Sequence, residues 1–476
     1  MFPNPQDALP LPPNPNLEQY KKLAKDLVKA CRQEAAGKKI KSKEHEDPGA
    51  PDQNLQEDAI GDWVLNWLET LARLQGLTIT PDVRKRIDRH AVPIEKFVRS
   101  KLSSTEELAA DLRGSQGSEV RTSAGEAKCK LADAQFVIAR SHGFLSWPKL
   151  AEHITELTRA SSAVSNFESA ADAIISGDVQ TLERLLREDP QLIRARSRRE
   201  HNAMLLHYVA ANGVENYRQK TPQNAAEILE VLLKAGAEVD ATADMYGGGA
   251  TTLGLVATSV HPERAGVQDA LMQILLNYGA AIDHPQGAGN DSCAVIGCLH
   301  NDRPRAAEFL AAHGARLNLE GAAGVGRLDV VKGFFNDDGS LKPDATKAQL
   351  QSGFIWACEY GRKDVVEFLL DKGVDLRAGE NTGETALHLA AHRGQLEMIR
   401  LLLDRGAPLE AKNVYGGTVL GQATWSVVHG DPSIDFVPVI EELLAAGAKI
   451  EEADYPTGNE RVDAVLEKYG KRVDGR

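Results

Sequence analysis

A repeated unit of 33 residues constrains the fold of this chain more than any other feature. Residues Glu384–Asn413 read ETALHLAAHRGQLEMIRLLLDRGAPLEAKN, and the segment before them reads SGFIWACEYGRKDVVEFLLDKGVDLRAGEN. When the two are aligned, Gly361 falls on Gly394 and Gly373 on Gly406, in each case 33 residues apart. Such a period is typical of solenoids, in which each unit packs on its neighbours.

The pattern inside the unit predicts two short antiparallel helices. Small and apolar residues in 386–391 form one face of a first helix, which Gly394 ends by accepting a left-handed conformation. The apolar stripe of a second helix occupies 398–403, and Gly406 stops it. A polar turn, Glu410–Gly417, then leads to the next pair. One such pair is too small to bury its own faces, so neighbours must stack.

This unit resembles the ankyrin repeat. TALHLAAHRG corresponds to the family's T-P-L-H-x-A signature, with Ala386 in place of its proline, and LLLDRGAPLEAKN to its second helix and finger turn. The resemblance implies an all-α ankyrin-repeat solenoid of about eight helix-turn-helix units over roughly residues 165–470. It also implies protein–protein binding as the function.

Weaker copies of the unit and several insertions complete the predicted array. The copies begin at Met204, Thr251, Cys293, Gly321 and Thr418, and the terminal caps lie at 171–188 and 461–472. Insertions at 214–224, 259–267 and 426–435 fall between the two helices of a unit, whereas 336–349 extends a finger. Insertions gathered on one edge of a solenoid often mark a used surface.

The chain before the repeats is a different, irregular helical region. Residues 1–16 are a Pro-rich leader that we expect to be disordered. Residues 17–160 are predicted to be helical, with two helices in 84–112 and a flexible linker near 114–128. The segment 131–154 is similar to a short helical segment that often precedes ankyrin arrays in bacteria. This region either packs on the first repeats as an extended cap or forms a separate adaptor module.

Few residues suggest chemistry. His388 and His392 have the i, i+4 spacing of a zinc pair, but His388 occupies the signature position of the repeat, as does His207 in its own unit. Cys293 and Cys298 fall on repeat positions that favour small packing residues. The sequence therefore predicts no catalytic residues, no metal and no cofactor. The alternatives are an enzyme or a small-molecule or metal sensor whose site forms between the N-terminal helices, the insertions and the repeats.

The net charge and the composition limit the classes of partner that we expect this chain to bind. The formal net charge of −13 opposes binding to phosphate backbones and anionic lipid, so we expect neither nucleic acid nor membrane as a partner. The first residues lack the basic and apolar stretches of a secretory signal, and the five cysteines are sparse and odd in number. These features predict a cytoplasmic protein that binds another protein.

Candidate partner-binding residues occupy the finger turns and the exposed side of the first helices, which together line the concave face of a solenoid. Exposed Tyr and Trp are favoured because they anchor partners at little entropic cost. The candidates in the fingers are Met245, Tyr246, Asn381, Thr382, Val414 and Tyr415. Those on first helices are Asn212, Glu359, Tyr360, His392, Arg393, Trp425 and His429.

Overall fold

The computed structural model describes residues 7–44, 58–102, 130–159, 161–283, 293–379 and 382–473. The chain divides into two compact units, unit 1 (Met1–Ala288) and unit 2 (Gly289–Arg476). Regular structure in the described residues is almost all helical, so the predicted all-α class is confirmed. The exception is a finger hairpin in which β1 (Thr242–Ala243) pairs antiparallel with β2 (Ala250–Thr251), Thr242 opposite Thr251.

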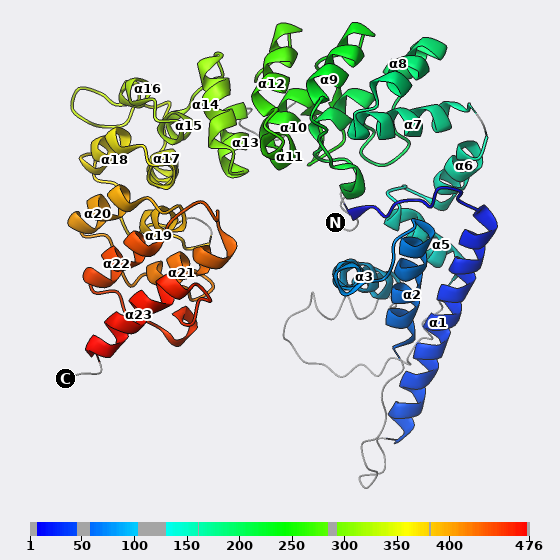
Figure 1. The fold of residues 1–476 in the computed structure, drawn as a ribbon, viewed down its shortest axis with the longest axis horizontal. Coiled ribbons are helices and arrows are strands. Elements are labelled where there is room, and N and C mark those ends of the chain that lie inside the picture. Colours follow the sequence, from blue (N-terminus) through cyan, green and yellow to red (C-terminus); the bar gives the residue numbers. More distant parts are fainter. Residues whose placement is uncertain are drawn as a thin grey trace, which may run out of the picture. The chain divides into compact units, whose positions relative to one another are not determined.

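In the described residues before 160, five helices of unit 1 share an apolar core (Figure 1). They are α1 (Leu17–Glu44), α2 (Ala59–Leu74), α3 (Pro81–Leu102), α5 (Leu131–Ser141) and α6 (Trp147–Leu157). Helix α3 is continuous over Pro81–Leu102, and the rest of the segment predicted to hold two helices, 103–112, lies outside the described residues. Pro93 removes one backbone hydrogen bond, but Ile87, Ile94 and Val98 on either side of it are all buried in this core and hold the helix together.

The described part of the Pro-rich leader packs against this core, in contrast to the expected disorder. Ala8 and Leu9 are buried. The Leu9 amide donates to the Ser141 carbonyl at 2.7 Å, and the Leu9 carbonyl lies 2.9 Å from Nδ1 of His142. These backbone contacts fix the leader because they satisfy polar groups that the end of α5 would otherwise leave buried.

The rest of unit 1 is a run of helix pairs, and the N-terminal helices pack on the first of them. Helix α6 contacts α7, the Gly143 carbonyl accepts from the Glu200 amide at 2.9 Å, and Arg140 pairs with Glu200 at 2.7 Å. Of the two arrangements left open by the sequence, the structure has the extended cap. The elements are α7 (Ala163–Ser176), α8 (Val179–Glu188), η2 (Pro190–Arg194), η3 (Leu205–Ala210), η4 (Asn216–Arg218), α9 (Ala225–Lys234), α10 (Thr252–Thr258), α11 (Val260–Arg264) and α12 (Gln268–Asn277).

Unit 2 continues the pattern of paired helices (Figure 1). Successive first helices contact one another, and among the second helices α16 contacts α18 and α20 contacts α22. A shared apolar core runs from α15 to α23. The 33-residue repeats therefore lie side by side, α17 against α19. The elements are α13 (Ala294–His300), α14 (Pro304–Ala312), α15 (Leu319–Gly324), α16 (Leu328–Gly333), α17 (Lys347–Glu359), α18 (Lys363–Leu370), α19 (Ala386–His392), α20 (Leu396–Asp404), α21 (Val419–His429), α22 (Val437–Ala445), η5 (Glu452–Asp454) and α23 (Glu460–Val473).

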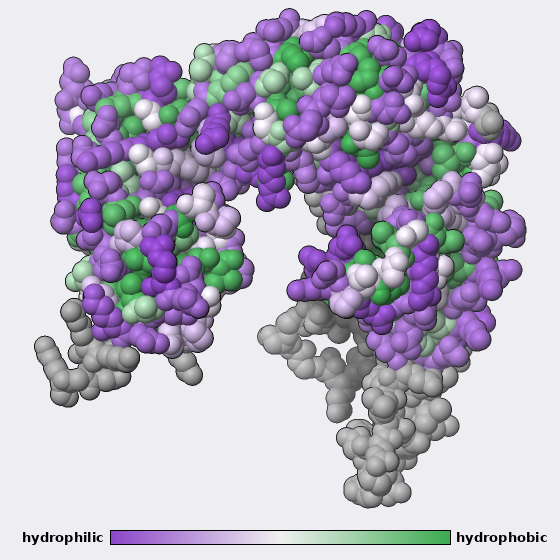
Figure 2. Space-filling view, in the orientation of Figure 1, coloured by the Kyte–Doolittle hydropathy of each residue, from purple (hydrophilic) through white to green (hydrophobic). Residues whose placement is uncertain are grey.

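Threonine and glycine set the ends of the first helices. The hydroxyls of Thr251 and Thr418 accept the backbone N–H three residues on, which caps α10 and α21. Gly361 and Gly394 follow α17 and α19 with φ of +70° and +65°, the left-handed conformation predicted for this position. On the face shown in Figure 2, hydrophilic residues cover most of each unit and apolar residues are exposed only in separate patches.

Candidate functional site

The signature histidine of each complete repeat holds the finger turn. His388 accepts the Thr385 amide on Nδ1 at 3.2 Å and donates from Nε2 to the Gly417 carbonyl at 3.3 Å. His207 does the same in unit 1, reaching the Ala241 carbonyl at 3.0 Å. Burial lowers the pKa of both imidazoles, to about 4 for His207, which keeps them neutral and able to accept as well as donate. The structural interpretation of His388 is confirmed.

A groove of about 860 Å³ lies on the repeats of unit 2. Four first helices form its floor, namely α17, α19 and α21 of successive repeats and the end of α13. The finger turn at 413–418 and the segment 451–457 complete its walls. A volume of this size is within the range of sites that hold a ligand of several side chains. The groove is the surface that the repeat pattern predicts to be used.

Aromatic rings gather in this groove. Trp425 and His429 are stacked with centroids 4.5 Å apart, and His392 lies 6.1 Å from Trp425 on the neighbouring first helix. Tyr415 on the finger is 82% exposed and Trp425 is 50% exposed. His392 is also held in place, because its Nδ1 lies 2.8 Å from the Ser426 hydroxyl. Rings that are fixed yet exposed can contact a partner without first losing much side-chain freedom.

The groove brings together six of the residues predicted from the sequence. They are Glu359, Tyr360, His392, Tyr415, Trp425 and His429. Arg393 lies behind them and pairs with Glu359 at 3.0 Å, while its guanidinium stands 5.7 Å over the Tyr360 ring. Thr382 and Val414 are joined by a backbone hydrogen bond of 2.8 Å but do not line the groove. Asn381 lies outside the described residues.

The remaining predicted residues lie in unit 1 around one finger. Tyr246 is half exposed and donates from its hydroxyl to the Asn212 side chain at 2.6 Å. Met245, predicted to be exposed at the fingertip, is instead only 1% exposed. Its side chain occupies the space over Gly213 that a Cβ would fill. Because glycine has no Cβ, the methionine can pack inward at this position. Met245 therefore offers no surface to a partner.

Comparison with known proteins identifies the repeats. Residues 319–413 and 354–454 match the family described as ankyrin repeats (3 copies). The chain therefore carries ankyrin repeats over residues 319–454. Among solved structures, the human ASB11 ankyrin repeat domain is similar, with 21% sequence identity and a TM-score of 0.31 over 60% of this chain and 99% of that one. No curated protein matches the chain.

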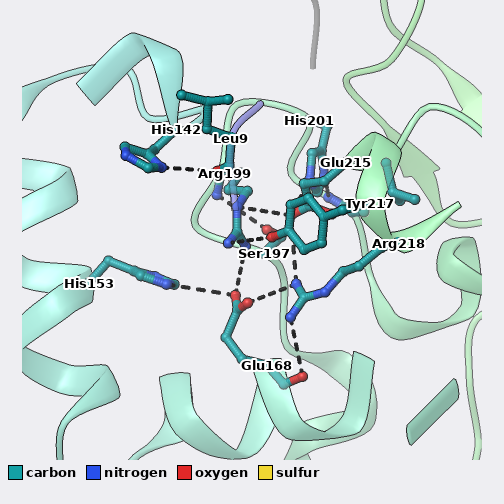
Figure 3. Close-up of polar contacts among 12 residues, drawn as sticks. Leu9, His142, His153, Glu168, Ser197, Arg199, His201, Glu215, Tyr217 and Arg218 are labelled. Carbon is teal, nitrogen blue, oxygen red and sulfur yellow. Dashed lines mark hydrogen bonds and ion pairs between the residues drawn. The ribbon is translucent and has the colours of Figure 1, made fainter. Parts of the chain in front are cut away.

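The second polar feature of the chain is a buried charge cluster in unit 1, drawn in Figure 3. Glu168 on α7 forms ion pairs with two arginines. Arg199, in the loop before η3, lies 2.8 Å from the Glu168 carboxylate, and Arg218, in the insertion 214–224, lies 2.7 Å from it. Glu215 of the same insertion lies 2.9 Å from Nε of Arg199. All four side chains are buried, so two positive and two negative charges balance inside the protein.

Three ring side chains surround the cluster. His153 on α6 lies 3.8 Å from Glu168, His201 lies 3.5 Å from Glu215, and the Tyr217 hydroxyl accepts from Arg199 at 3.2 Å. The cluster thus joins α6, α7 and the insertion across four segments of the chain. Because its charges are matched and buried, it stabilises this arrangement of the N-terminal cap and offers no open surface to a substrate.

Opposing effects set the protonation of the cluster. Burial raises the pKa of Glu168, but the charges of Arg199 and Arg218 outweigh burial and hold that pKa at about 2. Burial lowers the pKa of His153 to about 4, with only partial compensation from Glu168. The carboxylate is therefore charged and the imidazole neutral near pH 7.

Sequence reasoning placed the insertion correctly between two helices but did not single out its charged residues. One signal was present, because Glu168 lies on the apolar stripe of α7 between Val164 and Ala171. A charged residue on a buried face requires a buried partner.

Two further features concern chemistry and membranes. Within the residues that the structure describes, no three His, Cys, Asp or Glu side chains are arranged to hold a metal ion. Across the same residues, no helix combines the length and apolar character of a membrane span.

Proposed function

We propose that this chain is a scaffold that binds another protein, and that a partner segment lies in the groove of unit 2. Ankyrin repeats generally mediate protein–protein interactions. The observation that carries the proposal is the groove itself, which collects exposed aromatic rings from successive repeats, among them Trp425 stacked on His429. The partner-binding candidates Tyr415 and Trp425 are its most exposed rings.

The shape of the groove favours an extended segment over a flat protein surface. Its floor spans three successive repeats and its walls rise at the finger and at 451–457. An extended segment can place alternate side chains between such walls, whereas a flat surface would reach only the rims. Fixed aromatic anchors contribute on the order of 2 kcal/mol each to such contacts.

A random twelve-residue peptide library displayed on phage, selected on the full chain, tests this function. Synthetic copies of the enriched peptides are titrated against the full chain, against the double variant Tyr415→Ala/Trp425→Ala and against Tyr278→Ala. Tyr278 is a matched control, since it is 43% exposed in unit 1 and lies outside the groove. We expect the double variant to lose at least tenfold in affinity and Tyr278→Ala to bind as the parent does.

Equal affinity of all three proteins for every enriched peptide would contradict groove binding. A circular dichroism melt of each variant separates lost contacts from lost folding.

A further inference from the structure

The groove of unit 2 has an uneven charge. Among the residues that the structure describes, its lining includes five carboxylates and no Lys or Arg. They are Asp302, Glu359, Glu384, Glu451 and Asp454. A concave surface lined by one sign of charge raises the local concentration of groups of the opposite sign.

Three of these carboxylates are matched by cations that lie behind them. Arg393 pairs with both Asp302 and Glu359, and Lys412 pairs with Glu451 at 2.7 Å. These three charges are therefore balanced by the protein itself.

The other two have no Lys or Arg within ion-pair distance among the described residues. Glu384 is half-buried and accepts the Thr382 hydroxyl at 2.8 Å. Asp454 is 4% exposed and accepts the Glu451 amide at 2.7 Å. Burial, and the negative charges of Glu451 and Glu410, raise the pKa of Asp454, as expected for a carboxylate that lacks a cation.

Open aromatic rings lie in the same groove as these carboxylates. The rings of Tyr415 and Trp425 are the exposed ones, and the face of such a ring attracts a cation. His392 does not replace the missing cation, since burial and the nearby Arg393 lower its pKa. The groove thus combines unmatched carboxylates and aromatic faces, the two kinds of group that bind an ammonium or guanidinium.

Resting on the proposed function, we infer that the partner segment inserts a lysine or arginine side chain into this groove, toward Glu384 and Asp454 and against the exposed aromatic rings. An acidic segment would face repulsion from the same carboxylates. Charge complementarity of this kind sets which partner is accepted more than how tightly it is held.

The peptides selected above supply the test. Each groove-dependent peptide is synthesised again with its basic residues replaced by norleucine, which keeps the chain length and removes the charge. All peptides are titrated against the parent and against Glu384→Gln, Asp454→Asn and Asp371→Asn. Asp371 is a matched control, because its replacement makes the same change in net charge at an exposed position outside the groove.

We expect the selected peptides to be enriched in Lys or Arg, and norleucine to weaken binding about tenfold or more. Glu384→Gln and Asp454→Asn should each weaken the basic peptide severalfold and leave its norleucine form unaffected, while Asp371→Asn changes neither. Melting curves establish that each variant is folded.

Two other outcomes are informative. Peptides that depend on Trp425 but lack basic residues, or that ignore both carboxylate substitutions, would overturn the charge inference and leave groove binding standing. A selection that yields no peptide dependent on Trp425 and Tyr415 would overturn both.

Discussion

Two of the insertions, one in each unit, are held by opposite kinds of contact. In unit 1, insertion 214–224 is fixed by buried ion pairs from Glu215 and Arg218. In unit 2, insertion 426–435 packs through Ile434 against Gly394, an apolar contact made possible by the absent Cβ. The charged side chains of the unit 1 cluster are buried and paired with one another, so they affect the stability of the fold. Two carboxylates that line the unit 2 groove, Glu384 and Asp454, have no Lys or Arg partner among the described residues, and our proposal assigns them to recognition.

The largest expected difference between the two units is in how much stability each loses when the pH is lowered. Burial lowers the pKa of His142, His153 and His207 in unit 1 to about 4, below the usual 6.5. The unfolded chain therefore takes up these protons first, and stability falls as the pH drops from about 6.5 toward 4, by about 3 kcal/mol for each histidine. Glu168, with its pKa at about 2, adds a further loss below pH 4.5.

Unit 2 should respond less to the same change. His388 shifts in the same direction, but the raised pKa of Asp454 has the opposite sign and favours the folded state as the pH falls. Hydrogen exchange at pH 7.0, 5.5 and 4.5, corrected for intrinsic rates, should show α5–α7 opening before α17–α20. Simultaneous loss of protection in both regions would contradict the contrast.

Removing one arginine from the buried charge cluster should give the next largest loss in the free energy of unfolding. Arg199→Met leaves Glu168 and Glu215 buried beside a single remaining arginine, and breaking a buried pair in this way costs about 3–5 kcal/mol. Its neighbour Arg198 is a matched control, since it pairs with Glu152 at the surface and Arg198→Met should cost about 1 kcal/mol or less. Urea unfolding followed by circular dichroism measures both; an equal loss would refute the structural role of the cluster.

The apolar contact between Ile434 and Gly394 should contribute less to stability than the charge cluster, and its contribution should not depend on pH. In Gly394→Ala, the new methyl would stand 2.5 Å from Cγ2 of Ile434 at a φ of +65°, so both strain and crowding apply. We expect a loss of about 2–3 kcal/mol. Gly406→Ala is the control, because its φ is also positive but the methyl meets nothing within 4 Å, and the loss should be about 1 kcal/mol. Melting at pH 7 and pH 5 should give the same difference.

The repeat fold could be predicted from the sequence because its rules are local. Glycine at the end of a first helix recurs after 33 residues, as Gly361 and Gly394 show, and His388 at the signature position contacts the next finger. The groove was partly predictable for the same reason, since six candidates at corresponding repeat positions converge.

The buried cluster depends instead on contacts distant in sequence. Glu168 meets a loop residue 31 positions away and an insertion residue 50 positions away, and no local pattern specifies either pairing. Met245 was misplaced for a related reason, because its burial depends on Gly213 in the turn after η3. Periodicity predicts what repeats, whereas these contacts occur once.

The smallest expected change in stability is that of Tyr415→Ala, and it tests whether the groove acts in recognition. Tyr415 is 82% exposed, so Tyr415→Ala removes little packing and should change the free energy of unfolding by no more than about 0.5 kcal/mol. The same substitution removes an anchor from the groove and should lower peptide affinity severalfold. A stability loss comparable to that of Gly394→Ala, measured by urea unfolding, would show that Tyr415 supports its neighbouring repeat, and its exposure would then no longer indicate a binding role.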